Sequence, residues 1–261
     1  MKIGTVLTAS DLNPLYCDFI PIFIRAWKLL FPEIDVIIVL VADLVPDNLS
    51  EFSDYIRCWK PVDGIHTAFQ AQCIRLLYPQ LIQRSEGVLI TDMDMLPMNR
   101  FYYEDAIKPI SDDTFVCYRD VCLPTELPIC YNIALPSVWK AVFEGETMDS
   151  WYKGSNYDGN HGGSGWSTDQ LVLIKKFNDY SGKKLILNDT LTRFNRLDRA
   201  YSSHFADING LRSKIASGAY SDYHCLRPYS EHKDMNNFIV DSLVRPVQLR
   251  KPIGKLTWLR I

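Results

Sequence analysis

The sequence predicts an α/β protein in which helices cover a largely parallel central sheet. Over residues 3–91 the apolar patterns run strand, helix, strand, strand, helix, strand, which is the order expected of linked βαβ units. The run Val36–Val41 is continuously apolar between Asp35 and Asp43, as is typical of a strand covered on both faces. A chain of 261 residues with 47% hydrophobic and 23% charged residues has the length and composition of one large globular domain.

The first half of the chain alternates short apolar runs with segments of helical spacing. Ile3–Thr8 predicts a buried strand, and the turn-rich segment after it ends at Pro14. From Tyr16 to Leu30 the apolar residues recur at helical spacing, which predicts a helix that ends before Pro32. The other elements expected in this half are strands at Ile56–Trp59 and Val88–Thr91 and a helix at His66–Ile82.

The second half is less regular, and no linker separates it from the first. We therefore expect a single domain over residues 1–261, with a nucleotide-binding half at about 1–95 and an acceptor-side half at about 96–261. Residues 153–168 are rich in Gly, Ser and Asn and predict a loop, and after residue 185 the pattern breaks into short pieces. The remaining expected elements are a strand at Phe115–Tyr118 and helices at Ser137–Glu144 and Leu171–Tyr180.

Charge, hydropathy and cysteine content exclude several classes of protein. A net charge of −3 without a basic stripe argues against a protein that binds nucleic-acid phosphates. The most apolar stretch, Val36–Ala42, is far shorter than a membrane span, so we expect no transmembrane segment. The seven cysteines are an odd number and contain no Cys-x-x-Cys pair, so we expect free thiols and a cytoplasmic protein.

The strongest local indication of chemistry is the segment Leu89–Leu96, in which one residue separates Asp92 from Asp94 at the end of an expected strand. In parallel sheets, ligands bind beyond the carboxyl ends of the strands. Two carboxylates at this place suit Mg²⁺ or Mn²⁺, and such an ion can also bridge a diphosphate. The alternative is a solvated turn that carries two acids, because short motifs often match by chance.

The segments Arg75–Leu81 and Val88–Asp94 resemble the core of the GT-A-fold glycosyltransferases. The resemblance is closest to the family-8 group, which includes glycogenin and bacterial lipopolysaccharide galactosyltransferases. It implies a GT-A fold in which Arg75, Asp92 and Met93 belong to the donor site. It also implies that Asp92 and Asp94 hold Mn²⁺, or Mg²⁺, on a nucleotide diphosphate. The alternative for Arg75 is a solvated helix face or a structural salt bridge.

Further matches follow in the order of that family. The segment after the first strand would cradle the nucleoside, and the resemblance assigns Tyr16 to stacking on the base. Tyr131-Asn132 resembles the F-N-x-G element whose Asn touches the donor sugar, although Ala134 stands where Gly is usual. The residues that the resemblance places around the nucleoside are Thr8, Ala9, Ser10, Asp11 and Tyr16.

Two later segments resemble the catalytic and metal-binding elements of the same family. Asp169 and Gln170 resemble the D-Q pair near the reacting carbon of the sugar, and Asp169 alternatively stabilises a helix N-terminus. Tyr223–Tyr229 resembles the H-x-x-G-x-x-K-P-W segment, in which the His is a metal ligand and the Lys binds phosphate. Here no Gly follows His224, and Arg227 comes three residues after it rather than six. Other candidates for the ligand position are His161 and His232.

Four aromatic residues flank the Gly-rich segment of the second half. Aromatic pairs normally indicate packing, but sugar rings also stack on such faces. The alternative is therefore an acceptor platform or a closing lid formed by Trp151, Tyr152, Tyr157 and Trp166.

These observations predict a metal-dependent glycosyltransferase that moves a sugar from a nucleotide diphosphate sugar to the hydroxyl of a glycan or another acceptor. The resemblance implies UDP-hexose as the donor and favours retention, whereas an inverting enzyme would use Asp169 as its base. One alternative is a non-catalytic carbohydrate-binding protein on the same fold. Another is a sugar-phosphate nucleotidyltransferase, but residues 8–14 lack the glycine that its phosphate loop requires.

Overall fold

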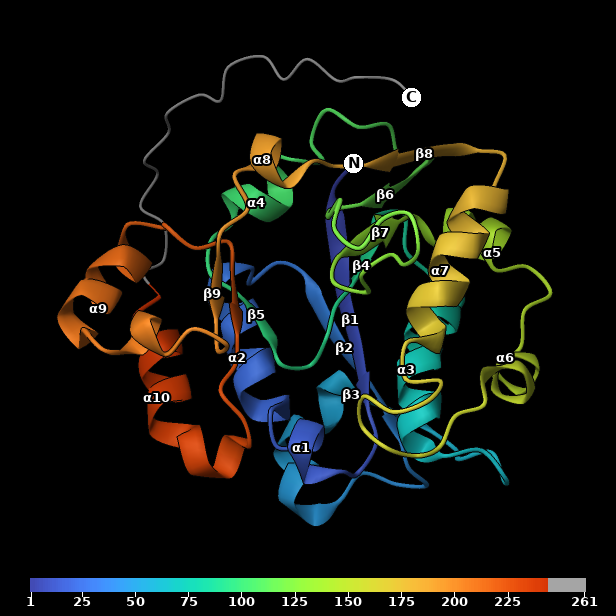
Figure 1. Cartoon of the computed structure of the whole chain (residues 1–261), viewed down its shortest axis with the longest axis horizontal. Coiled ribbons are helices and arrows are strands. Elements are labelled where there is room, and N and C mark those ends of the chain that lie inside the picture. Colours follow the sequence, from blue (N-terminus) through green and yellow to red (C-terminus); the bar gives the residue numbers. More distant parts are fainter. Residues whose placement is uncertain (244–261) are drawn as a thin grey trace.

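The computed structural model describes residues 1–243, which form one α/β domain around a seven-stranded sheet (Figure 1). The sheet is parallel except at β7, which runs antiparallel to both of its neighbours. In spatial order its strands are β3 (Ile56–Trp59), β2 (Asp35–Val41), β1 (Ile3–Ser10), β4 (Gly87–Ile90), β7 (Asn132–Ala134), β6 (Thr114–Cys117) and β8 (Lys183–Ile186). The expected fold class is confirmed.

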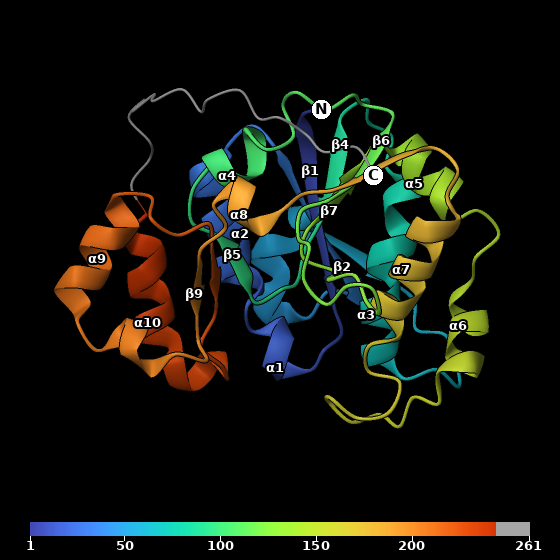
Figure 2. The same ribbon diagram turned by 45° about the horizontal axis from the view of Figure 1, so that its top comes forward.

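Two hydrophobic cores enclose the sheet, one on each face. In β2 the residues Val36, Ile38 and Leu40 join one core, whereas Val39 and Val41 join the other. The apolar run of this strand is thus explained by burial on both sides. One face is covered by α3 (Thr67–Leu77), α5 (Pro136–Val142), α6 (Met148–Ser155) and α7 (Thr168–Asp179), and the opposite face by α2 (Ile20–Leu30) and α4 (Phe101–Glu104) (Figure 2).

A second sheet of three strands packs on the α2 side of the molecule. Its central strand, β10 (Asp222–His224), runs antiparallel to β5 (Met95–Pro97) and parallel to β9 (Arg196–Asp198). Because β5 begins directly after Asp94, this sheet brings the end of β10 beside the segment that follows β4. The helices α9 (Ile208–Ala216) and α10 (Tyr229–Asp241) lie on the outer side of this small sheet (Figure 1).

Three sequence expectations are corrected by the structure. The helix expected at Tyr16–Leu30 is divided into α1 (Pro14–Cys17) and α2. Pro21 causes the division, because a proline ring clashes with the carbonyl four residues earlier in a continuous helix. The helix expected at His66–Ile82 ends at Leu77 and continues only as a 3₁₀ turn. The expectation of short pieces after residue 185 does not hold at α10, which spans thirteen mostly polar residues, kinks at His232 and buries only a narrow face.

Within residues 1–243, no helix is long and apolar enough to cross a membrane. All seven cysteines carry free thiols, and five of them are buried in the cores or beneath the loops. A short helix, α8 (Asp189–Thr192), connects β8 to β9.

Candidate active site

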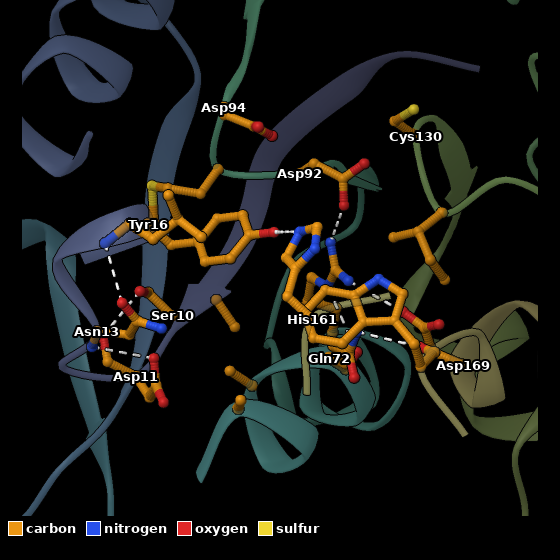
Figure 3. A pocket seen from close by; sticks show the side chains of 18 of the residues that line it. Ser10, Asp11, Asn13, Tyr16, Gln72, Asp92, Asp94, Cys130, His161 and Asp169 are labelled. Atoms are coloured by element: carbon orange, nitrogen blue, oxygen red, sulfur yellow. Dashed lines mark hydrogen bonds and ion pairs between the residues drawn. The ribbon is translucent and has the colours of Figure 1, made fainter. Parts of the chain in front are cut away.

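A cavity of about 330 Å³ lies at the carboxyl ends of β1 and β4 (Figure 3). This is the edge of a parallel sheet at which ligands are expected. It brings together residues that are far apart in the chain, from the first strand, α3, the segment after β4, the start of α7 and the end of β10. Of the residues expected at the site, those that line the cavity are Ala9, Ser10, Asp11, Tyr16, Arg75, Asp92, Met93, Asp94, Asp169, Gln170, His224 and Arg227.

The end of β1 is shaped by a short network of hydrogen bonds. Thr67 at the start of α3 donates its hydroxyl to Asp11 Oδ2 at 2.8 Å, and the backbone N–H of Asn13 donates to Asp11 Oδ1 at 3.1 Å. The Ser10 hydroxyl donates to the Asp11 carbonyl at 2.7 Å. These contacts fix the direction in which the chain leaves the sheet and tie β1 to α3 at the rim of the cavity.

Arg75 lies at the centre of the first charged cluster. Its guanidinium forms ion pairs with Asp92 Oδ1 and, at 3.0 Å, with Asp169 Oδ2. Arg75 also donates to the carbonyls of Thr91 and Gln72, at 3.4 and 3.3 Å. A single cation on α3 thus joins the segment after β4 to the start of α7, and two carboxylates share its charge.

Burial changes the acidity of the carboxylate on α7. The Asp169 side chain is only 4% exposed. Burial raises its pKa to about 6, although Arg75 opposes that shift, and nearby Asp92 adds to it by like-charge repulsion. The pKa of Asp169 is therefore raised above that of an ordinary aspartate, as is typical of groups at functional sites.

Asp94 lies at the centre of the second charged cluster. The composition of this cluster is the reverse of that of the first. Arg199 Nη1 contacts Asp94 Oδ2 at 2.6 Å, His224 Nε2 lies 3.6 Å from the same oxygen and Arg227 Nη1 lies 3.7 Å from it. Burial disfavours the ionised form of Asp94, but His224 and Arg199 outweigh it and hold the pKa well below its usual range. One buried acid is therefore surrounded by three basic groups.

The orientation of His224 is fixed from its other side. Its Nδ1 lies 3.2 Å from Asp198 Oδ1, and the parallel pairing of β9 with β10 sets these two residues opposite each other. The backbone N–H of Cys225 donates to the Asp94 carbonyl at 2.9 Å. The small sheet thereby directs His224 Nε2 towards Asp94 and into the cavity.

Tyr16 connects two walls of the cavity. Its hydroxyl accepts a hydrogen bond from Arg227 Nη1 at 2.8 Å and lies 2.9 Å from His161 Nε2. His161 packs against Trp166, with ring centroids 4.4 Å apart, in the Gly-rich segment between α6 and α7. The Gln72 side-chain amide on α3 anchors this segment by donating a hydrogen bond to the Trp166 carbonyl at 3.1 Å. Through His161 the segment therefore reaches Tyr16 at the cavity wall (Figure 3).

Two residues expected at the donor site do not line the cavity. Thr8 is fully buried within β1. Asn132 is fully buried on β7, where its amide donates to the carbonyls of Pro128 and Ile129, at 2.8 Å each. Asn132 thus supports the loop that carries Cys130 to the cavity wall.

The aromatic residues around the Gly-rich segment divide into two groups. Tyr157 and Trp166 line the cavity and stack on each other, with centroids 6.4 Å apart. Tyr152 instead packs on Phe69 in the core, and Trp151 is buried against Phe143. His232, the other candidate metal ligand of the second half, lies on α10 and does not line the cavity.

Sequence reasoning missed Arg199, Asp198 and Gln72. Arg199 and Asp198 come at the end of β9, a three-residue strand with no clear pattern. The one indication in the sequence was a charged pair at the end of a strand. Only the pairing of β9 with β10 reveals that this pair reaches the cluster around Asp94. Gln72 stands one turn before Arg75 on α3, so its position on the same helix face was available from the spacing.

The donor chemistry of Asp92, Asp94 and His224 fits a hard divalent cation. Carboxylates suit Mn²⁺ or Mg²⁺, and an imidazole held at its other nitrogen by a carboxylate is a common arrangement for a metal ligand. Within residues 1–243, no three acidic, His or Cys side chains stand close enough together to hold an ion as placed. Both carboxylates are turned towards arginines. The residue types therefore fit, and the ion pairs have to open.

Several glycosyltransferases of known structure are similar to this chain. The glycosyltransferase GlyE of Streptococcus pneumoniae TIGR4 has a TM-score of 0.52 and 12% identity, over 96% of this chain and 66% of its own. The galactosyltransferase LgtC in complex with donor and acceptor sugar analogues has a TM-score of 0.47 and 13% identity, over 93% of this chain and 98% of its own. A glycosyltransferase involved in glycosylation of the major capsid of PBCV-1 has a TM-score of 0.47 and 9% identity, over 91% and 99%.

No protein-family model matches the chain, and no curated protein matches its sequence. At 12% identity the similarity to GlyE shows the fold, and it confirms the expected GT-A architecture. The chemistry of the cavity has to be argued from its own residues.

Proposed function

We propose that the protein is a glycosyltransferase that moves a sugar from a nucleotide diphosphate sugar to a hydroxyl group of an acceptor. The observation that carries this proposal is the pair of charged clusters around Asp92 and Asp94, at the edge of the sheet where ligands bind. In glycosyl transfer, negative charge develops on the leaving phosphate and positive charge on the anomeric carbon. A base-rich and an acid-rich cluster at two ends of one cavity match that division of charge.

Asp92, Asp94 and His224 are the residues proposed to hold Mn²⁺ or Mg²⁺. Such an ion supplies positive charge that neutralises the donor's diphosphate. Asp198 keeps His224 Nε2 directed at Asp94, and Arg227 lies on the same side of the cavity. The diphosphate is therefore assigned to the Asp94 end, with Arg227 in contact with it.

The sugar is assigned to the Arg75 end. Once Asp92 turns to the cation, Arg75 would contact the donor while it keeps its ion pair with Asp169. In its ionised form Asp169 stabilises positive charge at the anomeric carbon, and Gln170 beside it orients the sugar. By resemblance to family 8 the reaction retains configuration and the donor is UDP-hexose. In an inverting reaction Asp169 is instead the base that deprotonates the acceptor hydroxyl.

The nucleoside is assigned to the rim formed by the end of β1. Ala9, Ser10 and Asp11 line this part of the cavity, and Tyr16 offers an aromatic ring beside them. The acceptor would enter under the Gly-rich segment, where the aromatic residues Tyr157 and Trp166 line the cavity. A glycan is the acceptor that suits such a surface.

A donor screen tests the proposal. The full chain is incubated with Mn²⁺ and a panel of UDP-, GDP- and TDP-sugars, and the release of nucleoside diphosphate is followed. We expect slow hydrolysis of one donor that EDTA and Asp94→Ala abolish. Arg84→Gln is the control, because Arg84 is exposed and pairs with Asp35, away from the cavity. No hydrolysis of any donor, together with no metal-dependent nucleotide binding by calorimetry, would overturn the proposal.

A further inference from the structure

Arg199 is the charged cavity residue to which the proposed reaction assigns no task. It follows the last residue of β9, and β9 pairs in parallel with β10, so Arg199 emerges beside the segment after His224. Its side chain is 19% exposed and lines the cavity. A guanidinium so placed, on the wall proposed for the diphosphate, requires an explanation.

The contacts of Arg199 are divided between two elements. Its Nη1 contacts Asp94 Oδ2 at 2.6 Å and donates to the Cys225 carbonyl at 2.9 Å. The carboxylate oxygen that it occupies is the one that faces His224 Nε2 at 3.6 Å. Arg199 therefore occupies the Asp94 oxygen that faces His224, which a cation bound by both residues would need.

Arg199 and Arg227 differ in how strongly they hold Asp94. Arg227 Nη1 is 3.7 Å from Asp94 Oδ2 and is hydrogen-bonded to Tyr16 at 2.8 Å. Arg199 forms the short ion pair, and the Asp94 side chain is only 5% exposed. A buried carboxylate without a partner is costly, so Arg199, together with His224 on the same oxygen, neutralises Asp94 in the free protein, and of the two arginines it is the one in direct contact.

We infer that Arg199 is the internal counter-ion of Asp94 in the free protein and becomes a ligand of the donor's diphosphate when Asp94 turns to a divalent cation. The Cys225 carbonyl holds the released guanidinium at the cavity wall. Guanidinium groups bind phosphate oxygens in a bidentate manner, so the released group has an anionic partner only when a donor is present. This inference rests on the proposed function.

The consequence is a coupling between metal and donor binding that passes through one side chain. Without a nucleotide, a cation has to displace Arg199 from Asp94, so its affinity is low. With a diphosphate present, Arg199 has a second partner and the displacement is easier. Such a coupling is reciprocal, so Arg199 strengthens nucleotide binding in the presence of metal by the same mechanism.

The test measures Mn²⁺ binding to the full chain without any nucleotide, from the loss of the electron paramagnetic resonance signal of free Mn²⁺. UDP, GDP and TDP are then titrated by calorimetry in the presence of Mn²⁺. We expect Arg199→Gln to bind Mn²⁺ alone about tenfold more tightly than the wild type and to bind the preferred diphosphate about tenfold more weakly. Arg84→Gln, which removes an equal charge outside the cavity, should match the wild type in both measurements.

Three results would overturn one of the two proposals, and they are distinguishable. If the wild type binds neither Mn²⁺ nor any diphosphate, the proposed function fails. If it binds both, but Arg199→Gln binds Mn²⁺ no more tightly, the role of Arg199 as counter-ion is wrong. If Arg199→Gln binds Mn²⁺ more tightly but binds the diphosphate as strongly as the wild type does, the role of Arg199 as a phosphate ligand is wrong. Arg199→Met, which keeps the aliphatic stem, replaces Arg199→Gln in both titrations if circular dichroism shows that the Gln variant is unfolded.

Discussion

The two acids of the segment after β4 are separated by one residue, yet they lie in opposite surroundings. Asp92 shares one cation, Arg75, with a second acid, Asp169. Asp94 is instead one acid among three basic groups. The first cluster is held by elements of the large sheet and its helices, whereas the second is completed by the small three-stranded sheet. The end of β4 therefore joins two differently charged ends of one cavity.

This difference indicates how one short motif can stabilise both the negative and the positive charge that develop in the proposed reaction. An excess of acids around Arg75 favours a partner that becomes positive, as an anomeric carbon does. An excess of bases around Asp94 favours an anionic partner, as a diphosphate is. The chain turns between these two acids, with the Met95 N–H donating to the Asp92 carbonyl at 3.3 Å, and this turn separates their surroundings without a long insertion.

The largest expected effect is the loss of Asp94. Asp94→Asn leaves three basic groups without their acid and should lower kcat/KM for donor hydrolysis about a thousandfold. Asp92→Asn should lower it by about a hundredfold, because Arg75 keeps Asp169 as a partner. Initial rates of nucleotide release measure both, with Asp35→Asn as a control outside the cavity. Equal losses in the two variants would break the comparison between the clusters.

A smaller loss of activity is expected at Asp169. Asp169→Asn should lower kcat about a hundredfold with little change in the donor KM, because the amide keeps the shape but not the charge. Burial raises the pKa of Asp169 to about 6, so wild-type kcat should fall as pH is lowered below that value. The pH profile of kcat measures this. A profile of the Asn variant with the same acid limb would show that another group titrates.

The same carboxyl group should make stability depend on pH. Burial raises the Asp169 pKa from 3.8 to about 6 in the folded state, so its contribution to stability is complete below pH 3.8 and is lost as pH rises through 6. Between pH 4 and pH 7 the unfolding free energy of the wild type should therefore fall by about 2 kcal/mol relative to Asp169→Asn. Urea denaturation at both pH values gives this difference. A parallel pH dependence of the two proteins would contradict it.

A third ion pair sharpens the comparison because it lies outside the cavity. Arg196 on β9 pairs with Asp222 on β10 at 2.6 Å, and Tyr131 donates its hydroxyl to the same fully buried acid at 2.8 Å. Arg196→Met should reduce the unfolding free energy by about 3 kcal/mol, because it leaves a buried acid unpaired. Chemical denaturation measures this loss. At a temperature where the variant is folded its donor KM should match the wild type, and a large increase in KM would place this pair in the site.

The sequence was sufficient for five strands of the large sheet, but not for β7 and β8 or for the small sheet. The strands β1, β2 and β4 are apolar runs with clear ends, and their pattern alone predicts a parallel sheet and its binding edge. β5, β9 and β10 have three residues each and are held by long-range pairing. Strands this short carry no periodicity, so their existence depends on the partners that the fold supplies.

The residues of the candidate site divide in the same way, into those that a sequence motif predicts and those that long-range strand pairing places. Arg75, Asp92 and Asp169 were found because motif and position agreed, and they form one cluster in the structure. Arg199 was missed because it depends on the pairing of β9 with β10. Asn132 was expected to touch the sugar, but its amide supports the loop of Cys130 instead of lining the cavity. Spacing places residues on an element, whereas burial and long-range pairing decide which of them reach the cavity.

The smallest expected effect lies where the Gly-rich segment touches the nucleoside end. His161 is exposed, and its Nε2 lies 2.9 Å from the Tyr16 hydroxyl. His161→Ala should raise the donor KM about threefold and leave kcat unchanged, because one exposed hydrogen bond contributes little. Tyr16→Phe should raise KM about tenfold, since it also removes the partner of Arg227. His232→Ala, outside the cavity, is the control. If both site variants raise KM equally, the segment rather than Arg227 holds Tyr16, and the base-rich end depends on the loop that closes it.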